Sequence, residues 1–294
     1  MYPAFFPRRK CPSLGPTLAP AVGLILSDAS NPFFAEIIPA IEECLGAAGF
    51  TTLLGNASED CTKEARLLKT MRECSPSGVL ICPSLGRDAV CTLHYGFMRA
   101  LATVAFARPV DGLDYVGVDN VGGAELAVDH LYQLGHRRIA FVGGQPQNIA
   151  RRERVEGYQR ALTRRKLPFE IEWIALSAPN TRGGYSSALD LLELKNPPTA
   201  AVCFNDLVAF GLIQALQQAD GKPGTEFGVV GFNDVAAAVH NCPPLTTVDT
   251  APRQLGEIAA ELLLHRITKP DSLLQKVMLQ PRLIVRQSCG TLPS

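Results

Sequence analysis

Four short polar segments each follow a stretch of apolar residues that has the pattern of a buried strand. They are residues 27–34, 143–154, 204–206 and 232–234. In an open α/β sheet the loops at the carboxyl ends of the strands meet along one crevice, where ligands bind. Hydroxyl, amide, aromatic and guanidinium groups placed together there would hydrogen-bond and stack on a small polar ligand. The candidate ligand-binding residues are Ser27, Phe33, Phe34, Arg154, Asn205, Asp206 and Asn233.

Phe33 and Phe34 open a predicted helix directly after the polar loop Ser27 to Asn31. An aromatic face there can stack on a sugar ring or a base, while the amides at the helix start bind hydroxyls or anions. Both rings could instead belong to the core, since phenylalanines on a helix face usually do. We expect one ring in the cleft and the other beneath it.

Arg154 carries a planar guanidinium that stays charged and can hold two vicinal hydroxyls or a carboxylate. The alternative is an exposed arginine, because the predicted helix from Arg151 to Lys166 is rich in basic residues. Asn205 offers donors and an acceptor to a ligand hydroxyl, whereas Asp206 can instead cap or support the helix that it begins.

The segment from Tyr115 to Gly144 shows how the chain builds the elements that carry these residues. An apolar run ends at Val118, a helical period of apolar residues follows from Val121, and a second apolar run covers 139–142. Gly135 stands where a helix end requires a left-handed residue, and His136 with the two arginines after it stands where cations favour the helix dipole. This is one βαβ unit.

Similar units lie on both sides, so strands and helices alternate along the chain. This alternation predicts an α/β fold with doubly wound parallel sheets. Asn31 is the expected cap of the first helix, with Pro32 at its first position. The other predicted strands are 21–26, 50–54, 78–82, 103–106, 173–176, 200–204, 227–231, 245–248, 276–279 and 283–286. The first predicted helix starts after Asn31. The other predicted helices cover 62–74, 89–101, 151–166, 183–194, 206–219 and 252–267.

Composition limits the class of protein. The 294 residues, 47% of them hydrophobic, correspond to about two folding units. Lys plus Arg and Asp plus Glu both number 28, so no basic excess points to nucleic acid as a direct partner. The nine cysteines form no C-x-x-C pair, which indicates a reducing, cytoplasmic location. No apolar run approaches the length of a membrane span.

Motifs for catalysis are absent. The sequence lacks a G-x-S-x-G elbow, a phosphate-binding G-x-x-x-x-G-K-[ST] loop and a G-x-G-x-x-G after the first strand. The five histidines have no metal-ligand spacing. We therefore expect no enzyme, no cofactor and no metal site.

Several segments resemble the ligand-binding part of the LacI/GalR family of bacterial transcription regulators. They are VGLILSDASNPFFAEI, VGVDN with the LGHRRIAFVGG that follows it, AVCFNDLVAFG, VVGFNDVAAAVHNCPPLTTV and the closing PRLIVRQSCG. Together they cover almost all of residues 21–290. The resemblance implies a sugar- or nucleoside-sensing domain with the fold of periplasmic binding proteins.

In that family each lobe is completed by returning chain, and three strands cross between the lobes. By resemblance, one lobe comprises residues 21–118 plus 249–280 and the other 119–248 plus 281–294. Arg154 matches the family's effector-binding arginine, and Asn205 with Asp206 matches a pair at the mouth of the cleft. Asn233 stands where many relatives have an acidic residue, and Ala107 stands where some relatives have an aspartate. A carboxylate-to-diol contact is therefore lost, and a standard monosaccharide is a poorer fit for the cleft. The segment GGQPQNIARRERVEGYQRALTRRKLPFEIEW gives a hint of similarity to the family's regulator of the maltose system.

The family also places a DNA-reading helix-turn-helix ahead of the segment that matches Ala21. Residues 1–20 contain five prolines, and we expect a disordered or remnant segment that cannot form such a head. The predicted function is the effector-sensing and dimerising domain of a regulator, which reaches operator DNA only through that head. The alternative is a solute-binding protein serving a transporter, which would need an export signal that this N-terminus does not supply.

Overall fold

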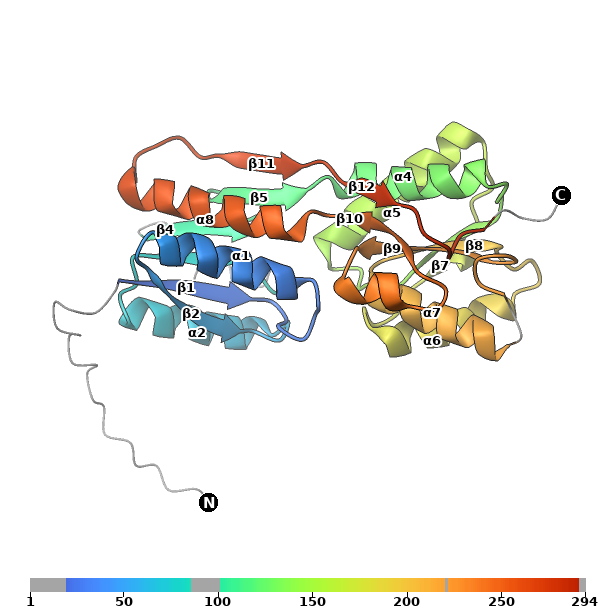
Figure 1. The fold of residues 1–294 in the computed structure, drawn as a ribbon, viewed down its shortest axis with the longest axis horizontal. Helices are drawn as coiled ribbons and strands as arrows, with labels where there is room; N and C mark the ends of the chain where they lie inside the picture. Colours follow the sequence, from blue (N-terminus) through green and yellow to red (C-terminus); the bar gives the residue numbers. More distant parts are fainter. Residues whose placement is uncertain (1–19, 86–100, 220–221, 291–294) are drawn as a thin grey trace, which may run out of the picture.

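The computed structural model describes residues 20–85, 101–219 and 222–290, which form two α/β lobes lying end to end (Figure 1). Each lobe is built on one six-stranded sheet. The inner strands of each sheet are buried, because their apolar runs of four to six residues are covered by helices on both faces, whereas the strands at the sheet edges are partly exposed. The predicted fold class, two doubly wound parallel sheets, is confirmed. The predicted helix 89–101 falls almost entirely outside the described residues, as do residues 1–19 of the predicted N-terminal segment.

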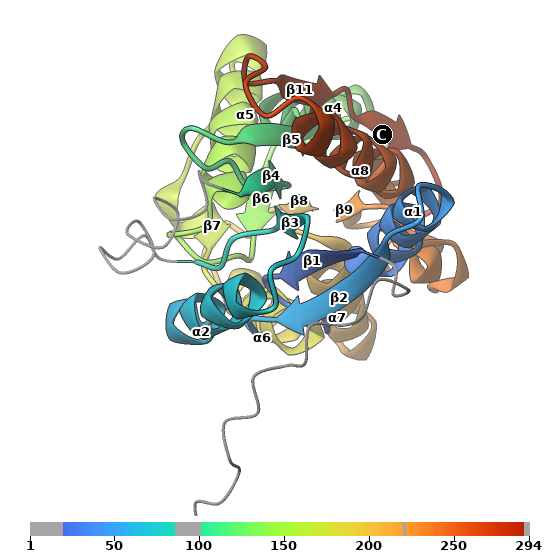
Figure 2. The same ribbon diagram turned by 90° about the vertical axis from the view of Figure 1, so that its left-hand side faces the viewer.

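The first-lobe sheet has the strand order β11-β5-β4-β3-β1-β2, and all its pairs are parallel. Helices α1 and α8 cover one face, with the larger core beneath them, and α2 covers the other face (Figure 2). The elements are β1 Ala21–Leu26, α1 Phe34–Ala47, β2 Thr51–Asn56, α2 Cys61–Glu73, β3 Gly78–Ile81, β4 Ala102–Phe106, β5 Asp114–Val118, α8 Pro252–Thr268 and β11 Lys276–Leu279.

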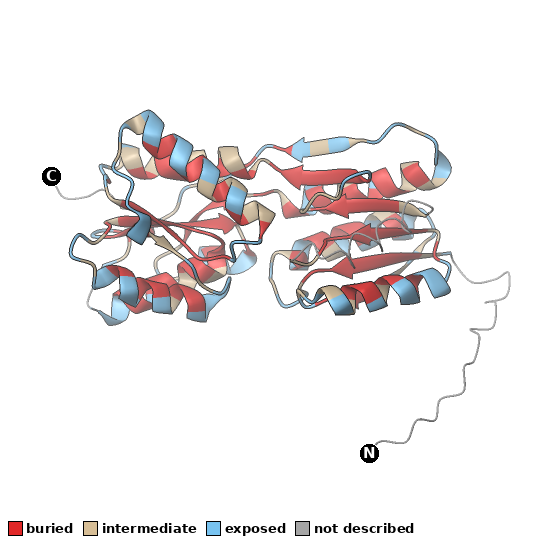
Figure 3. Cartoon of the chain, turned by 180° about the vertical axis from the view of Figure 1, so that it is seen from behind, coloured by how far each residue is buried: buried red, intermediate tan, exposed pale blue. Residues whose placement is uncertain are grey.

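The second-lobe sheet has the order β12-β10-β9-β8-β6-β7, in which only β12 is antiparallel to its neighbour. Two separate clusters of buried residues lie against its two faces, and the buried layer between exposed helix faces is visible in Figure 3. The elements are α4 Asn120–Gln133, β6 Ile139–Val142, α5 Ile149–Arg165, η1 Ile171–Trp173, β7 Ile174–Ala175, α6 Thr181–Leu192, β8 Ala200–Cys203, α7 Asp206–Gln218, β9 Gly228–Asn233, η2 Ala236–His240, β10 Thr246–Asp249 and β12 Arg282–Ile284.

Three passages of chain connect the lobes. They lead from β5 to α4, from β10 to α8 and from β11 to β12. In the second passage Ala251 has a left-handed φ of 48°, and its amide donates to Oδ1 of Asp249 over 2.7 Å. The carboxyl ends of the central strands of both sheets therefore face the region between the lobes.

Local sequence signals account for most helix ends. Asp119 caps α4 by accepting from the amide of Gly122, and Gly135 has the left-handed φ of +97° that its position after the helix predicts. Asn148 caps α5 in the same way, accepting from Ala150 and Arg151.

Three details of the sequence prediction are wrong. The first helix is capped at Phe33, two residues later than expected, because Pro32 lies in a preceding turn in which Asn31 Oδ1 accepts from the Phe33 amide over 3.0 Å. The predicted strand 173–176 is wrong at both ends, because only Ile174–Ala175 form the strand β7 and Trp173 is the last residue of a short 3-10 helix. His136 is no cation at the helix end: it is 1% exposed, and burial lowers its pKa to about 4, so it is neutral at pH 7.

Among the described residues no helix is both long and apolar enough to cross a membrane.

Candidate functional site

A cavity of about 600 Å³, including the part open to solvent, lies between the carboxyl ends of the two sheets. Both lobes contribute to its lining, which among the described residues consists of Ser27, Asn31, Phe33, Phe34, Cys82, Ala107, Arg108, Val118, Asn120, Asn148, Ala150, Arg154, Phe204, Asn205, Asn233, Thr250 and Leu255. All of the sequence-predicted site residues except Asp206 are in this set.

The two phenylalanines of the first lobe both line the cavity but differ in burial. Phe34 is 3% exposed and packs edge-on against Phe106 in the core, with ring centroids 6.3 Å apart. Phe33 is only partly buried and meets Phe34 at 5.3 Å. Phe33 is therefore the more accessible aromatic surface, while Phe34 mainly supports it.

Ser27 and Arg108 complete the first-lobe wall. Ser27 is 2% exposed and accepts a hydrogen bond from the Cys82 thiol. Arg108 binds Glu59 in a paired arrangement, with its two terminal nitrogens 2.9 and 2.7 Å from the two carboxylate oxygens. One of these nitrogens also donates to the carbonyl of Pro83 over 2.6 Å. The charge of Arg108 is thus neutralised within its own lobe.

Arg154 dominates the second-lobe wall. It is 7% exposed, its Nε donates to Asn120 Oδ1 over 2.9 Å, and one terminal nitrogen donates to the carbonyl of Phe204. The guanidinium lies over the ring of Phe232, 3.6 Å from its centroid, and near Phe204 at 5.0 Å. Its position on α5 places it opposite the exposed face of that helix, so the alternative of a solvent-exposed arginine is excluded.

Burial has an electrostatic cost for this residue. It lowers the pKa of Arg154 to about 9, while the negative charges of Glu153 and Asp206 act in the opposite direction. At neutral pH the guanidinium stays protonated. Asn120 connects this system to Glu153, because its Nδ2 donates to the Glu153 carboxylate over 2.8 Å.

Asn205 and Asp206 take different positions. Asn205 is the cap of α7, accepting from the amide of Val208 over 2.9 Å, and its Nδ2 donates to the Pro179 carbonyl over 3.0 Å. Asp206 is 1% exposed and is absent from the cavity lining. Its carboxylate accepts from the Val235 amide over 2.8 Å and from the Thr247 hydroxyl over 2.5 Å. The capping role considered for Asp206 thus belongs to Asn205, and Asp206 supports the loop after β9.

Asn233 and Ala107, where the family resemblance suggested that a carboxylate is missing, both line the cavity. Both also have left-handed backbones, with φ of 111° at Asn233 and 58° at Ala107. Asn233 is the last residue of β9 and Ala107 directly follows β4, so both left-handed residues lie where a strand passes into a loop.

Five further polar residues line the cavity without having been named as candidates: Asn31, Asn120, Asn148, Arg108 and Thr250. Asn31 and Asn148 lie within the predicted polar segments 27–34 and 143–154. Asn120 follows a strand, so the rule that found the other clusters could have found it as well. Thr250 lies in one of the passages between the lobes, and its hydroxyl is buried without a hydrogen-bond partner in the described part of the chain. Among the described residues no group of three or more His, Cys, Asp or Glu side chains could hold a metal ion.

The sequence has clear relatives. Residues 128–289 match the family described as the periplasmic binding protein-like domain. The chain is similar to the HTH-type transcriptional repressor PurR of Haemophilus influenzae (strain PittEE), with 30% identity over 272 residues that cover 91% of this chain and 81% of the relative.

Solved structures give the same result for the fold. The transcriptional regulator CelR in complex with cellobiose is 26% identical, with a TM-score of 0.83 over 91% of this chain and 84% of that one. A LacI family transcriptional regulator from Enterococcus faecium with bound ribose is 26% identical, with a TM-score of 0.81 over 93% of this chain and all (100%) of that one.

Proposed function

This chain belongs to the LacI/GalR family of transcriptional regulators, as its sequence motifs led us to expect, and on that premise we propose that its cleft senses a small metabolite. The effector we propose is sugar-like or nucleoside-like. It binds between the lobes, and its binding changes the angle between them. The relatives are repressors and regulators, which agrees with the prediction that the chain is no enzyme.

The observation that carries this proposal is the composition of the cavity walls. One wall presents the accessible ring of Phe33, and the other presents Arg154 with the amides of Asn148, Asn205 and Asn233. An aromatic ring on one side of the cavity and several hydrogen-bond donors on the other can together bind a ligand ring that carries polar substituents. The named relatives with bound cellobiose and bound ribose support a ligand of this kind.

Movement of the lobes follows from the position of the site. A ligand that contacts both walls stabilises the arrangement in which both walls reach it, and so shifts the population of lobe angles. We propose lobe boundaries at residues 118/119, 248/249 and 280/281. The first and third lie within passages that connect the sheets, and the second lies one residue before the end of β10. We further propose that the chain forms a homodimer, because an operator with twofold symmetry needs two DNA-reading heads.

A solute-binding protein of the same fold is the alternative function. The match to a repressor over 91% of this chain supports the regulator instead.

The proposal is tested by a thermal-shift screen of the chain against monosaccharides, disaccharides, nucleobases and nucleosides. A ligand at 100 times its dissociation constant stabilises by about 2.7 kcal/mol, which corresponds to a rise in Tm of several degrees. We expect one chemical class to raise the Tm of the wild type and to leave Arg154→Ala unchanged.

Arg152→Ala is the matched control, because Arg152 lies on the same helix but is exposed. It should respond to the ligand like the wild type. A folded wild-type chain that no compound stabilises would contradict the proposed sensing function. Small-angle X-ray scattering with and without the ligand then checks the change in lobe angle.

A further inference from the structure

The charges around the cavity are unequal. Among the described residues that line it there are two arginines and no Asp, Glu, Lys or His. A cavity that binds neutral sugars through carboxylates would need acidic side chains in its walls. The described walls instead supply donors and positive charge, and this excess is the starting point for the identity of the ligand.

Within the described part of the chain, only one of the two arginines forms a direct ion pair. Arg108 is held by both oxygens of Glu59. Arg154 makes no ion pair with a described carboxylate, and its partners are an amide oxygen, a carbonyl oxygen and two aromatic faces. The carboxylate of Glu153 is held by the Asn120 amide, and that of Asp206 by Val235 and Thr247.

A buried guanidinium without a counter-ion is unfavourable, because neutral hydrogen bonds do not replace the hydration that the charge has lost. Hydroxyl groups of a neutral ligand would accept its hydrogen bonds but leave the charge uncompensated. A carboxylate or a phosphate would do both, and its oxygens match the planar geometry of the guanidinium.

Other free donors lie along the same cavity. The Thr250 hydroxyl is buried without a partner in the described part of the chain, and it lines the cavity from the passage between the lobes. The side-chain nitrogen of Asn148 makes no hydrogen bond among the described residues, because the cap of α5 uses only the oxygen of that amide. These groups fit the remaining polar atoms of a ligand anchored on Arg154.

We infer that the effector is an anion, a small metabolite whose carboxylate or phosphate group binds Arg154. The inference rests on the proposed sensing function and narrows its ligand class. Phe33 then covers the opposite side of the ligand, and the compensated pair of Arg108 and Glu59 contributes no net charge.

Matched neutral and charged probes test this inference by isothermal titration calorimetry at pH 7.5. D-glucose is compared with D-glucuronate and D-glucose 6-phosphate, and D-ribose with D-ribose 5-phosphate, with inorganic phosphate as the smallest anion. We expect at least one charged probe to bind about 10-fold or more tightly than its neutral partner. A preference for the carboxylate members or for the phosphate members identifies the group that Arg154 holds, and either preference supports the inference.

Variants of one helix localise the effect. Arg154→Gln should lower the affinity for the charged probe about 100-fold and abolish its advantage over the neutral partner. Arg154→Lys should keep the preference at reduced affinity, because it keeps the charge without the planar fork. Arg152→Gln should bind like the wild type. If Arg154→Gln fails to fold, the Nε–Hε NMR resonance of Arg154 in the wild type, assigned by its absence from Arg154→Lys, must shift on addition of the anion.

Two outcomes overturn the inference and are distinguishable. Neutral probes that bind as tightly as their charged partners, in both the wild type and Arg154→Gln, overturn the anion and leave the sensing function in place. A folded chain that binds no probe of either kind overturns the inference, and it overturns the proposed function as well when the thermal-shift screen also finds no ligand.

Discussion

In the first-lobe wall of the cleft Arg108 is neutralised by Glu59, whereas Arg154 in the second-lobe wall contacts only neutral groups. Arg154 is buried and Arg108 is partly buried, and both line the same cavity. The two arginines differ in whether the protein places a free carboxylate next to the guanidinium. Glu59, in the turn after β2, faces Arg108 directly, while the acidic residues near Arg154 are engaged by other partners.

The two walls of the cleft therefore offer a ligand different kinds of interaction. In the first-lobe wall the charge of Arg108 is neutralised by Glu59, and the wall presents an aromatic surface that continues into the lobe core. The second-lobe wall is mainly polar, and its Arg154 carries a positive charge that can pair with a charged group of a ligand. A ligand that contacts both walls thus gains different kinds of interaction from each.

The largest effect is expected where the first-lobe wall merges with the core. Phe34→Ala should reduce the free energy of unfolding by about 3–5 kcal/mol, because it removes a fully buried ring that packs on Phe106. Phe33→Ala removes a partly buried ring and should cost only about 1 kcal/mol, but it should weaken ligand binding. Denaturant unfolding and calorimetry with the ligand separate these effects.

Phe169→Ala provides the control, since this ring is 44% exposed and is absent from the described cavity lining. It should change neither stability nor binding appreciably. Equal losses of stability for Phe33→Ala and Phe34→Ala would show that the wall and the core cannot be separated.

The two phenylalanines also show what the sequence could predict. Their spacing with Ile37, Ile41 and Leu45 indicated a helix with one buried face, and that face is buried. The strands could also be predicted, because exposing an apolar run such as AVGLIL to water is unfavourable and the run therefore indicates a buried strand. Loops after these strands then had to meet at one edge, which located the cleft.

The electrostatics of the cleft were beyond prediction. The sequence named Arg154 as a candidate for the cleft but left open an exposed arginine, because arginine is usually exposed; Arg151 and Arg154 both lie on the buried face of α5. The partner of Arg154 at Asn120 is 34 residues away, and Glu59 is 49 residues from Arg108. Such pairings depend on how the strands are ordered in the sheet, and no local pattern reports that order.

The second prediction removes the compensation in the first-lobe wall. Glu59→Gln leaves the guanidinium of Arg108 without a counter-ion and should cost about 2 kcal/mol of stability. It should also strengthen binding of a charged ligand about 5-fold, because Arg108 would then add its attraction to that of Arg154. Thermal unfolding and titration calorimetry measure the two changes.

Glu43→Gln is the matched control, because it breaks an ion pair with Arg253 in which both side chains are more than half exposed. Such a pair contributes little to stability. If Glu59→Gln and Glu43→Gln behave alike, then neutralisation of Arg108 does not distinguish the two walls.

The third prediction uses pH to report on the support of the second-lobe wall. Burial raises the pKa of Asp206 to about 7, against the lowering effect of its bonds to Thr247 and Val235. As pH falls from 7 towards 4, the folded state takes up this proton before the unfolded state does. Asp206 therefore contributes a gain in stability of up to about 1.4 kcal/mol per pH unit over this window.

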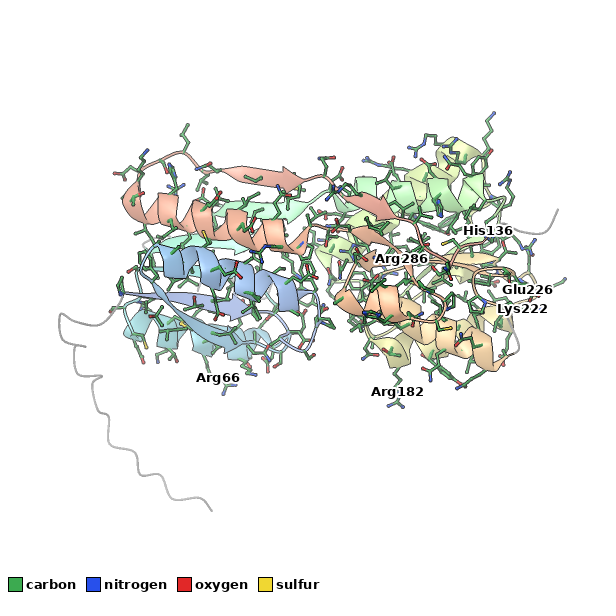
Figure 4. All side chains as sticks on the ribbon, in the orientation of Figure 1. Arg66, His136, Arg182, Lys222, Glu226 and Arg286 are labelled. Atoms are coloured by element: carbon green, nitrogen blue, oxygen red, sulfur yellow. The ribbon has the colours of Figure 1, made fainter. Side chains whose placement is uncertain are left out.

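His136, which Figure 4 labels in the second lobe, acts in the opposite direction. Its pKa of about 4 means that the unfolded state binds the proton first, so this group lowers stability as pH falls through 6.5. The difference between wild type and Asp206→Asn isolates the contribution of Asp206. Parallel stability–pH curves for the two proteins would contradict a raised pKa.

The smallest effect, and the one that sharpens the second-lobe wall most, concerns Asn205. Asn205→Ala removes the cap of α7 and should cost about 1 kcal/mol. Asn180→Ala removes the corresponding cap of α6, where the side chain accepts from the Gly183 amide, and should cost a similar amount. The two caps differ in position, because Asn180 is exposed and only Asn205 lines the cavity.

Each polar atom of the Asn205 amide is already engaged once, by Val208 and by Pro179. An amide oxygen has a second lone pair and the nitrogen a second hydrogen, so one acceptor and one donor remain for a ligand. We therefore expect Asn205→Ala to weaken ligand binding about 5- to 10-fold, and Asn180→Ala to leave it unchanged, with calorimetry on both variants as the measurement. Equal binding by both variants would assign Asn205 to capping alone, and recognition by the second-lobe wall would then depend on Arg154 and the remaining amides.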